Sequence, residues 1–119
     1  MNDTNIIADK SKSFAIRMIR LYNYLVNEKK EYVMSKQILR SGTSIGANVR
    51  ESIRAQSKSD FISKINIALK EAEETCYWLE LLHETEFVQD NEFSSVYPEA
   101  EELIKLLVSI IKATKQNES

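Results

Sequence analysis

Both glycines of this 119-residue chain, Gly42 and Gly46, lie four residues apart inside a segment with strongly helical neighbours. Each glycine in a helix interior costs about 1 kcal/mol relative to alanine, so the pair needs a compensating interaction. A helix surface without side chains allows the backbone of another helix to approach closely. We therefore predict that residues 38–51 form the tightest helix–helix contact of a bundle, with Gly42 and Gly46 at that contact.

Apolar residues recur at three- and four-residue spacing in four stretches, the pattern of amphipathic helices. These stretches cover about residues 6–28, 32–56, 57–85 and 92–113. Because the turns between them are short, the predicted fold is all-α, an antiparallel up-down-up-down four-helix bundle. The whole chain, residues 1–119, is predicted to be a single domain with an ordered core at about 6–114.

Two residues give further detail about the helix boundaries. Ser57 is followed three residues later by Asp60, a spacing that resembles a capping box and predicts a new helix start. Pro98 lies inside the last apolar repeat, where proline removes one backbone hydrogen bond. Because the repeat is unbroken from Phe93, we expect a kink or a short offset helix in preference to a first-turn proline.

Composition restricts the environment and the partners. The single cysteine, Cys76, excludes an internal disulfide and fits a reducing cytoplasm. We see no signal peptide and no apolar run of membrane-spanning length, so a cytoplasmic protein without membrane contact is expected. The net charge of −2 hides an asymmetry, because residues 1–70 carry a net +7 and residues 71–119 a net −9.

A row of cations follows one side of the second predicted helix, with no acid in line. At about 100° per residue these side chains fall on one face. The row comprises Lys36, Arg40, Arg50, Arg54 and Lys58. Such a row predicts binding to nucleic-acid phosphates without base specificity. Two alternatives are a solvated surface and pairing with the acidic helices of a neighbouring subunit.

A polar edge borders this row on the same helix. Its members are Arg40, Ser44, Asn48 and Glu51, at three- and four-residue spacing. Because buried polar groups need partners, we interpret the set as a structural hydrogen-bonded network at a helix or subunit contact.

The third predicted helix is apolar on a second side, through Ile67, Trp78 and Leu81. In a bundle of this size, an additional apolar side favours a contact between subunits.

Catalytic chemistry has little support in this sequence. Glu80 and His83 have the Glu-x-x-His spacing of di-iron bundles, but such sites need two of these motifs and this chain has one histidine. Cys76 and His83 lie about 10 Å apart by helical rise, too far for a nucleophile–base pair. We therefore expect no catalytic residues, no metal, no cofactor and no small-molecule substrate.

Three motifs resemble those of a known family. They are Gln37-Ile38-Leu39-Arg40-Ser41, Ser44-Ile45, Ala47-Asn48-Val49 and Glu51; then Ser59-Asp60-Phe61; then Ile67-Ala68, Lys70-Glu71-Ala72 and Glu74-Thr75. The chain is similar over about residues 12–114 to bacterial four-helix-bundle proteins first found encoded in intervening sequences of 23S rRNA genes. Many relatives have a small residue at Arg50, so this chain departs from the family within its cationic row.

The resemblance implies a homopentamer around a central channel, with no catalytic residues. From the location of the family's genes, the resemblance also implies a role with rRNA. A related bundle, the accessory protein of diversity-generating retroelements, implies nucleic-acid binding together with a reverse transcriptase. Our first hypothesis is thus a non-enzymatic oligomeric bundle that binds RNA. The alternatives are a protein-interaction scaffold without nucleic-acid binding and, least favoured, a metal enzyme that uses Glu80 and His83.

Overall fold

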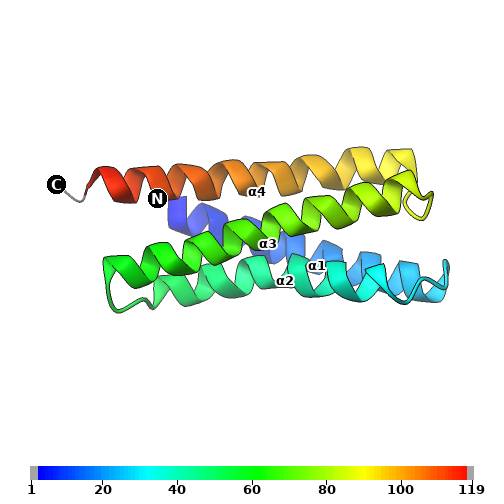
Figure 1. Ribbon diagram of the computed structural model, residues 1–119, viewed down its shortest axis with the longest axis horizontal. Helices are drawn as coiled ribbons and strands as arrows, with labels where there is room; N and C mark the ends of the chain where they lie inside the picture. The colour runs from blue at the N-terminus through cyan, green and yellow to red at the C-terminus, as the bar shows by residue number, and fades with distance from the viewer. Residues whose placement is uncertain (1–2, 118–119) are drawn as a thin grey trace.

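The computed structural model describes residues 3–117 as four helices: α1 (Asp3–Asn27), α2 (Met34–Ile53), α3 (Lys58–Glu84) and α4 (Asp90–Gln116). Consecutive helices run antiparallel and pack side by side, and α4 returns beside α1 (Figure 1). The backbones of the diagonal pairs α1–α3 and α2–α4 do not approach closely. The rod measures 51 × 22 × 22 Å. The predicted up-down-up-down bundle is confirmed.

Each helix contributes one apolar face to a continuous core. The largest fully buried side chains are Ile7, Phe14, Met18, Leu25, Ile38, Ile45, Val49, Ile65, Leu79, Leu82, Leu103 and Leu107. Some large apolar side chains lie outside this core, among them Ile19, which is 46 % exposed, and Ile53, which is 52 % exposed. Ile53 is the last residue of α2, which ends before the predicted position 56, so no further turn covers it.

The start of α2 depends on a buried carboxylate in the loop after α1. Glu31 is only 9 % exposed. Its two carboxylate oxygens accept the backbone N–H groups of Val33, Met34 and Ser35, at 3.2, 3.0 and 2.7 Å. These amides are orphan donors at a helix start, where negative charge is also favourable. The sequence does not indicate this cap, because the run of charged residues that ends at Glu31 is typical of a solvent-exposed turn.

The start of α3 follows the predicted cap. The Ser57 hydroxyl accepts the backbone N–H of Asp60 at 3.0 Å, and the helix begins at Lys58. This prediction is confirmed, because the serine-to-amide bond is local and depends on spacing alone.

Pro98 lies inside α4, which is one continuous helix on both sides of it (Figure 1). The preference for an interior proline over a first-turn proline is confirmed, whereas the alternative of a short offset helix was wrong. The proline leaves the carbonyl of Ser94 without its helical donor. Both residues are exposed, so water can reach that carbonyl and the break costs less than it would in the core.

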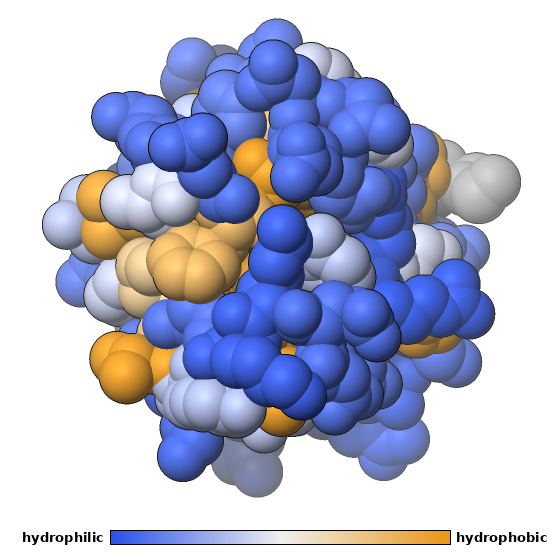
Figure 2. Space-filling view, turned by 90° about the vertical axis from the view of Figure 1, so that its right-hand side faces the viewer, coloured by the Kyte–Doolittle hydropathy of each residue, from blue (hydrophilic) through white to orange (hydrophobic). Residues whose placement is uncertain are grey.

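Both termini of the described chain lie at the end that carries the α2–α3 connection (Figure 1). The opposite end carries the α1–α2 loop and the α3–α4 turn, and hydrophilic side chains cover most of it, with apolar ones gathered in a smaller area (Figure 2). None of the helices within residues 3–117 has the length and hydrophobicity that a membrane span requires.

Candidate nucleic-acid interface

The glycine pair determines which side of α2 faces outward. Gly42 is buried against α1, and a Cβ atom built there would lie 2.3 Å from Met18 Cγ. A Cβ atom at Gly46 would lie 3.4 Å from the backbone oxygen of Ser11, also on α1. Both glycines thus lie at the α1–α2 contact. Because α2 is held there, the residues on its opposite side are directed away from the core.

Three members of the cationic row are exposed and unengaged. The side chains of Lys36, Arg50 and Arg54 form no ion pair or hydrogen bond within residues 3–117. Lys36 and Arg50 lie on α2, and Arg54 directly follows its last residue. We call these three residues the free cationic row. Their charges are available to an anionic ligand without first breaking an internal pair.

The other two members of the predicted row have partners inside the protein. The Arg40 guanidinium pairs with Glu71 at 3.2 Å and also with Glu74, both on α3. These bonds, that with Glu74 foremost, raise the pKa of Arg40. Lys58 belongs to α3, not to α2, and its ammonium donates to the backbone carbonyl of Asn117 at 3.0 Å. No acid of α2 lies in line with the row, but α3 supplies two acids to Arg40, which the pattern of α2 alone does not indicate.

Glu74 receives two donors on the outer side of the α2–α3 contact. The indole N–H of Trp78 donates to it at 2.9 Å, and Arg40 donates a second bond. The indole bond, followed by the arginine, lowers the pKa of Glu74. A carboxyl with a lowered pKa stabilises the fold above its unfolded-state pKa, and this contribution is lost as the pH falls through the folded-state value.

The four residues of the polar edge are linked through backbone carbonyls and through ion pairs to α3, and not side chain to side chain. The Ser44 hydroxyl donates to the Arg40 carbonyl at 2.6 Å, and the Asn48 amide donates to the Ser44 carbonyl at 2.9 Å. Glu51 instead pairs with Lys64 of α3 at 3.2 Å. Two of the four residues therefore bond to their own helix, and the two charged ones reach across to α3. Short polar side chains on a helix, such as those of Ser44 and Asn48, readily donate hydrogen bonds to the backbone carbonyl four residues earlier.

The three apolar residues predicted to contact another subunit differ in exposure. Ile67 is 39 % exposed, whereas Leu81 is partly buried and Trp78 packs partly against the core. Next to Trp78, the ring of Tyr77 is 54 % exposed and lies edge-on to the indole, with ring centroids 5.3 Å apart. The outer side of α3 thus presents apolar surface to solvent.

Glu80 and His83 have separate partners. The Tyr97 hydroxyl donates to Glu80 at 2.5 Å, which raises the pKa of Tyr97. His83 Nε2 lies 2.7 Å from a carboxylate oxygen of Asp90, and its ring stacks on Phe93. Within the part of the chain that the structure describes, no group of three or more His, Cys, Asp or Glu side chains could hold a metal.

Cys76 lies in the core of the α3–α4 layer and is 7 % exposed. Burial, together with the nearby carboxylates of Glu101 and Glu80, raises the pKa of this thiol to about 11. Stabilisation by the neutral thiol is complete below its ordinary pKa near 9 and is lost as the pH rises through 11.

This burial predicts that the Cys76 thiol reacts slowly with thiol reagents. Because the thiolate is the reacting form and a buried thiol is inert, we expect Cys76 to react with an aromatic disulfide reagent at pH 8 at least about 100-fold more slowly in the folded protein than in urea. The release of the aromatic thiol is followed by absorbance. Comparable rates in both conditions would contradict the burial of this side chain.

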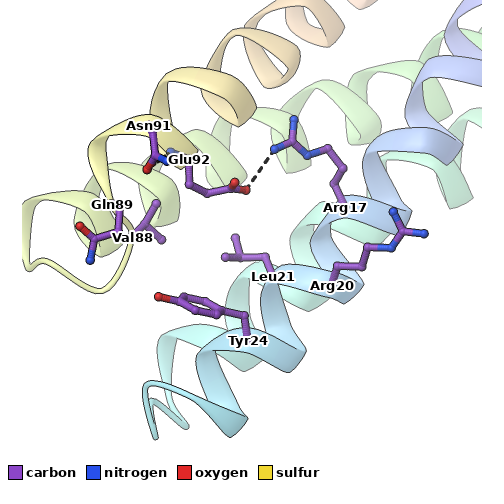
Figure 3. A pocket seen from close by; sticks show the side chains of 8 residues that line it. All are labelled: Arg17, Arg20, Leu21, Tyr24, Val88, Gln89, Asn91 and Glu92. Carbon is purple, nitrogen blue, oxygen red and sulfur yellow. Dashed lines mark hydrogen bonds and ion pairs between the residues drawn. The ribbon is translucent and has the colours of Figure 1, made fainter.

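A pocket of about 490 Å³ opens between α1 and the start of α4 (Figure 3). Arg17 lies at its wall, but its guanidinium already pairs with Glu92 at 3.0 Å and with Glu99 at 2.8 Å. The Glu92 carboxylate also lines the pocket. A second arginine, Arg20, also lines the pocket and forms no ion pair within the described residues. An anion entering there would meet this one free cation beside a neutralised arginine and an acid, which is less favourable for a phosphate than a site lined by cations alone.

Comparison with known proteins identifies the family. The model of the 23S rRNA-intervening sequence protein family matches residues 3–109. The chain therefore belongs to this family, and the resemblance inferred from its motifs is confirmed. A solved structure from Bacteroides thetaiotaomicron VPI-5482, a protein of unknown function from the S23 ribosomal protein family, is 59 % identical with a TM-score of 0.92. The match covers 93 % of this chain and 99 % of that one. No curated protein matches this chain.

Proposed function

We propose that this protein is a non-enzymatic, self-associating four-helix bundle that binds RNA or another nucleic acid through the free cationic row. The observation that supports this function is the contrast within the predicted row. Arg40 is neutralised by two acids of α3, whereas Lys36, Arg50 and Arg54 are exposed and unpaired within the described residues. When such cations bind the phosphates of a polyanion, counterions are released from the polyanion, which favours binding. Because these cations have no partners inside the protein, no internal salt bridge has to be broken first.

The dimensions of the row agree with a ligand of several nucleotides. From Lys36 to Arg54 the helical rise amounts to about 27 Å. Contacts of this kind go to phosphates and position the nucleic acid without reading its bases. The family name, which refers to an intervening sequence of 23S rRNA, makes structured RNA the first ligand to examine.

Charge reversal tests this function directly. In a double variant with Arg50→Glu and Arg54→Glu, we expect affinity for a structured RNA to fall at least about tenfold, because two attractions become repulsions. Affinity would be measured by electrophoretic shift over a series of salt concentrations, and helicity by circular dichroism. Both arginines are exposed, so the fold should be unaffected.

The matched control is the double variant with Lys105→Glu and Lys112→Glu on α4. These lysines are also exposed and unpaired within the described residues, and their reversal changes the net charge by the same amount. We expect the control to weaken binding less than about threefold. Equal effects of the two double variants, or no effect of either, would refute binding through the free cationic row.

A protein-interaction scaffold is the second candidate, and exposed apolar surface at Ile67 and Tyr77 favours it. That surface, with Trp78 and Leu81, is also where we place self-association, into a pentamer by the family resemblance. Light scattering with and without RNA separates the two functions. A scaffold keeps its mass when RNA is added, whereas the proposed function predicts a heavier complex.

A further inference from the structure

A groove of about 360 Å³ lies between α1 and α2, next to the free cationic row. Two cations flank it, Lys12 from α1 and Arg50 from α2. Its other walls are formed by small or short side chains, among them Ala15 on α1 and Thr43 and Ala47 on α2. Gly46 also lines it, so the backbone of α2 is accessible from the groove.

The charges of this groove are all of one sign. Lys12 of α1 and Arg50 of the free cationic row are both exposed, and neither side chain forms an ion pair or hydrogen bond within residues 3–117. No carboxylate of the described residues lines the groove. The pocket of Figure 3 differs, since Glu92 lines it and pairs with Arg17, one of its two arginines. An anionic ligand is therefore more favoured in the α1–α2 groove, which has no acid, than in the pocket beside α4.

The shape of the groove follows from the glycine contact. Because Gly42 and Gly46 bring α2 close to α1, the outer seam between the two helices is bordered by alanine, glycine and threonine. Large side chains do not fill it, so one strand of a polymer can lie along it near the helix backbones. Proteins that bind single strands without sequence preference use positively charged grooves that follow the sugar–phosphate backbone.

We propose that the α1–α2 groove seats the backbone of a single-stranded nucleic acid segment between Lys12 and Arg50. This inference rests on the proposed function and refines it in two respects. It adds a residue of α1 to the binding surface, and it selects single-stranded over double-stranded ligand.

The first test fills the groove without changing charge. Ala47 is exposed, so Ala47→Leu should leave the core and the helicity intact. We expect this variant to bind a fluorescein-labelled uridine 12-mer at least about tenfold more weakly by fluorescence anisotropy, while affinity for a blunt RNA duplex changes less than about threefold. Ala113→Leu, at an exposed alanine of α4, is the matched control and should change neither affinity more than about twofold.

The second test removes the charge from α1. For single strands, each phosphate contact contributes about 0.7 to the slope of log affinity against log salt concentration. We expect Lys12→Gln to reduce that slope by about 0.7 and Lys70→Gln, an exposed lysine of α3, to leave it unchanged.

The outcomes distinguish this inference from the proposed function. If reversal of Arg50 and Arg54 weakens binding but Ala47→Leu and Lys12→Gln do not, the groove is not the seat and the proposed function stands. Equal losses for the uridine 12-mer and the duplex on Ala47→Leu would refute the preference for a single strand. If none of these variants changes binding, both proposals fail.

Discussion

Replacement of Gly42 by alanine is expected to destabilise the protein by about 1–3 kcal/mol, the usual cost of overpacking a core. The added Cβ would lie 2.3 Å from Met18 Cγ and 3.0 Å from Met18 Cβ. Met18 is fully buried, and its Cβ is fixed to the α1 backbone. The clash is therefore relieved only if α1 and α2 move apart. The packing energy lost in that movement exceeds the stabilisation of about 1 kcal/mol that alanine brings over glycine in a helix. Urea unfolding followed by circular dichroism measures the loss.

Gly46→Ala is the matched control for this prediction. A Cβ at Gly46 would lie 3.4 Å from the Ser11 backbone oxygen, close to ordinary contact, so we expect no loss of stability. In addition, Gly42→Ala should cost less in a Met18→Ala background, because the clashing side chain is then absent. Equal costs for the two glycines, or the same cost in both backgrounds, would show that the contact with Met18 does not limit the packing.

Removal of the Glu31 carboxylate is expected to cost about 1.5–3 kcal/mol, the range for hydrogen bonds to a charged group. In Glu31→Ala, the N–H groups of Val33, Met34 and Ser35 lose their acceptor at the start of α2. Urea unfolding gives the change in stability. Hydrogen exchange of the Met34 and Ser35 amides shows whether the loss is local, since these amides should exchange faster than those in the middle of α2.

Two variants sharpen the test of Glu31. Glu31→Gln keeps one acceptor oxygen and should lose less stability than the alanine variant. Glu28→Ala removes an exposed acid in the turn that follows α1 and should change stability by no more than about 0.5 kcal/mol. If Glu28→Ala and Glu31→Ala cost the same, the effect is one of net charge and not of the three backbone bonds.

The parts of the fold that could be predicted depend on residues close together in the sequence. The four apolar repeats predicted four helices, and the Ser57–Asp60 spacing predicted the start of α3. The Glu31 cap is equally local, with partners two to four residues away, yet it was missed. A glutamate that precedes a helix among lysines and other acids has the same pattern as a solvated turn, and only its burial distinguishes the two.

The candidate interface was predicted only in part. The face of α2 that carries the cations follows from helical periodicity, which holds for any straight helix. Whether each cation has a partner does not follow from it. Arg40 meets acids that come 31 and 34 residues later, and Lys58 meets a carbonyl 59 residues later. The difference between Gly42 and Gly46 likewise depends on which residue of α1 lies opposite each of them.

The sequence by itself determined the helices, their order, the seam of small residues on α2 and the family of the protein. Those properties arise from backbone periodicity and short-range hydrogen bonds, which act over a few residues. The tertiary structure alone decided which charges are neutralised, which of the two glycines leaves no room for a Cβ atom, and which groove is lined by cations without an acid. These properties depend on the register and rotation of each helix against its neighbours, and such details are set by the packing of the whole core.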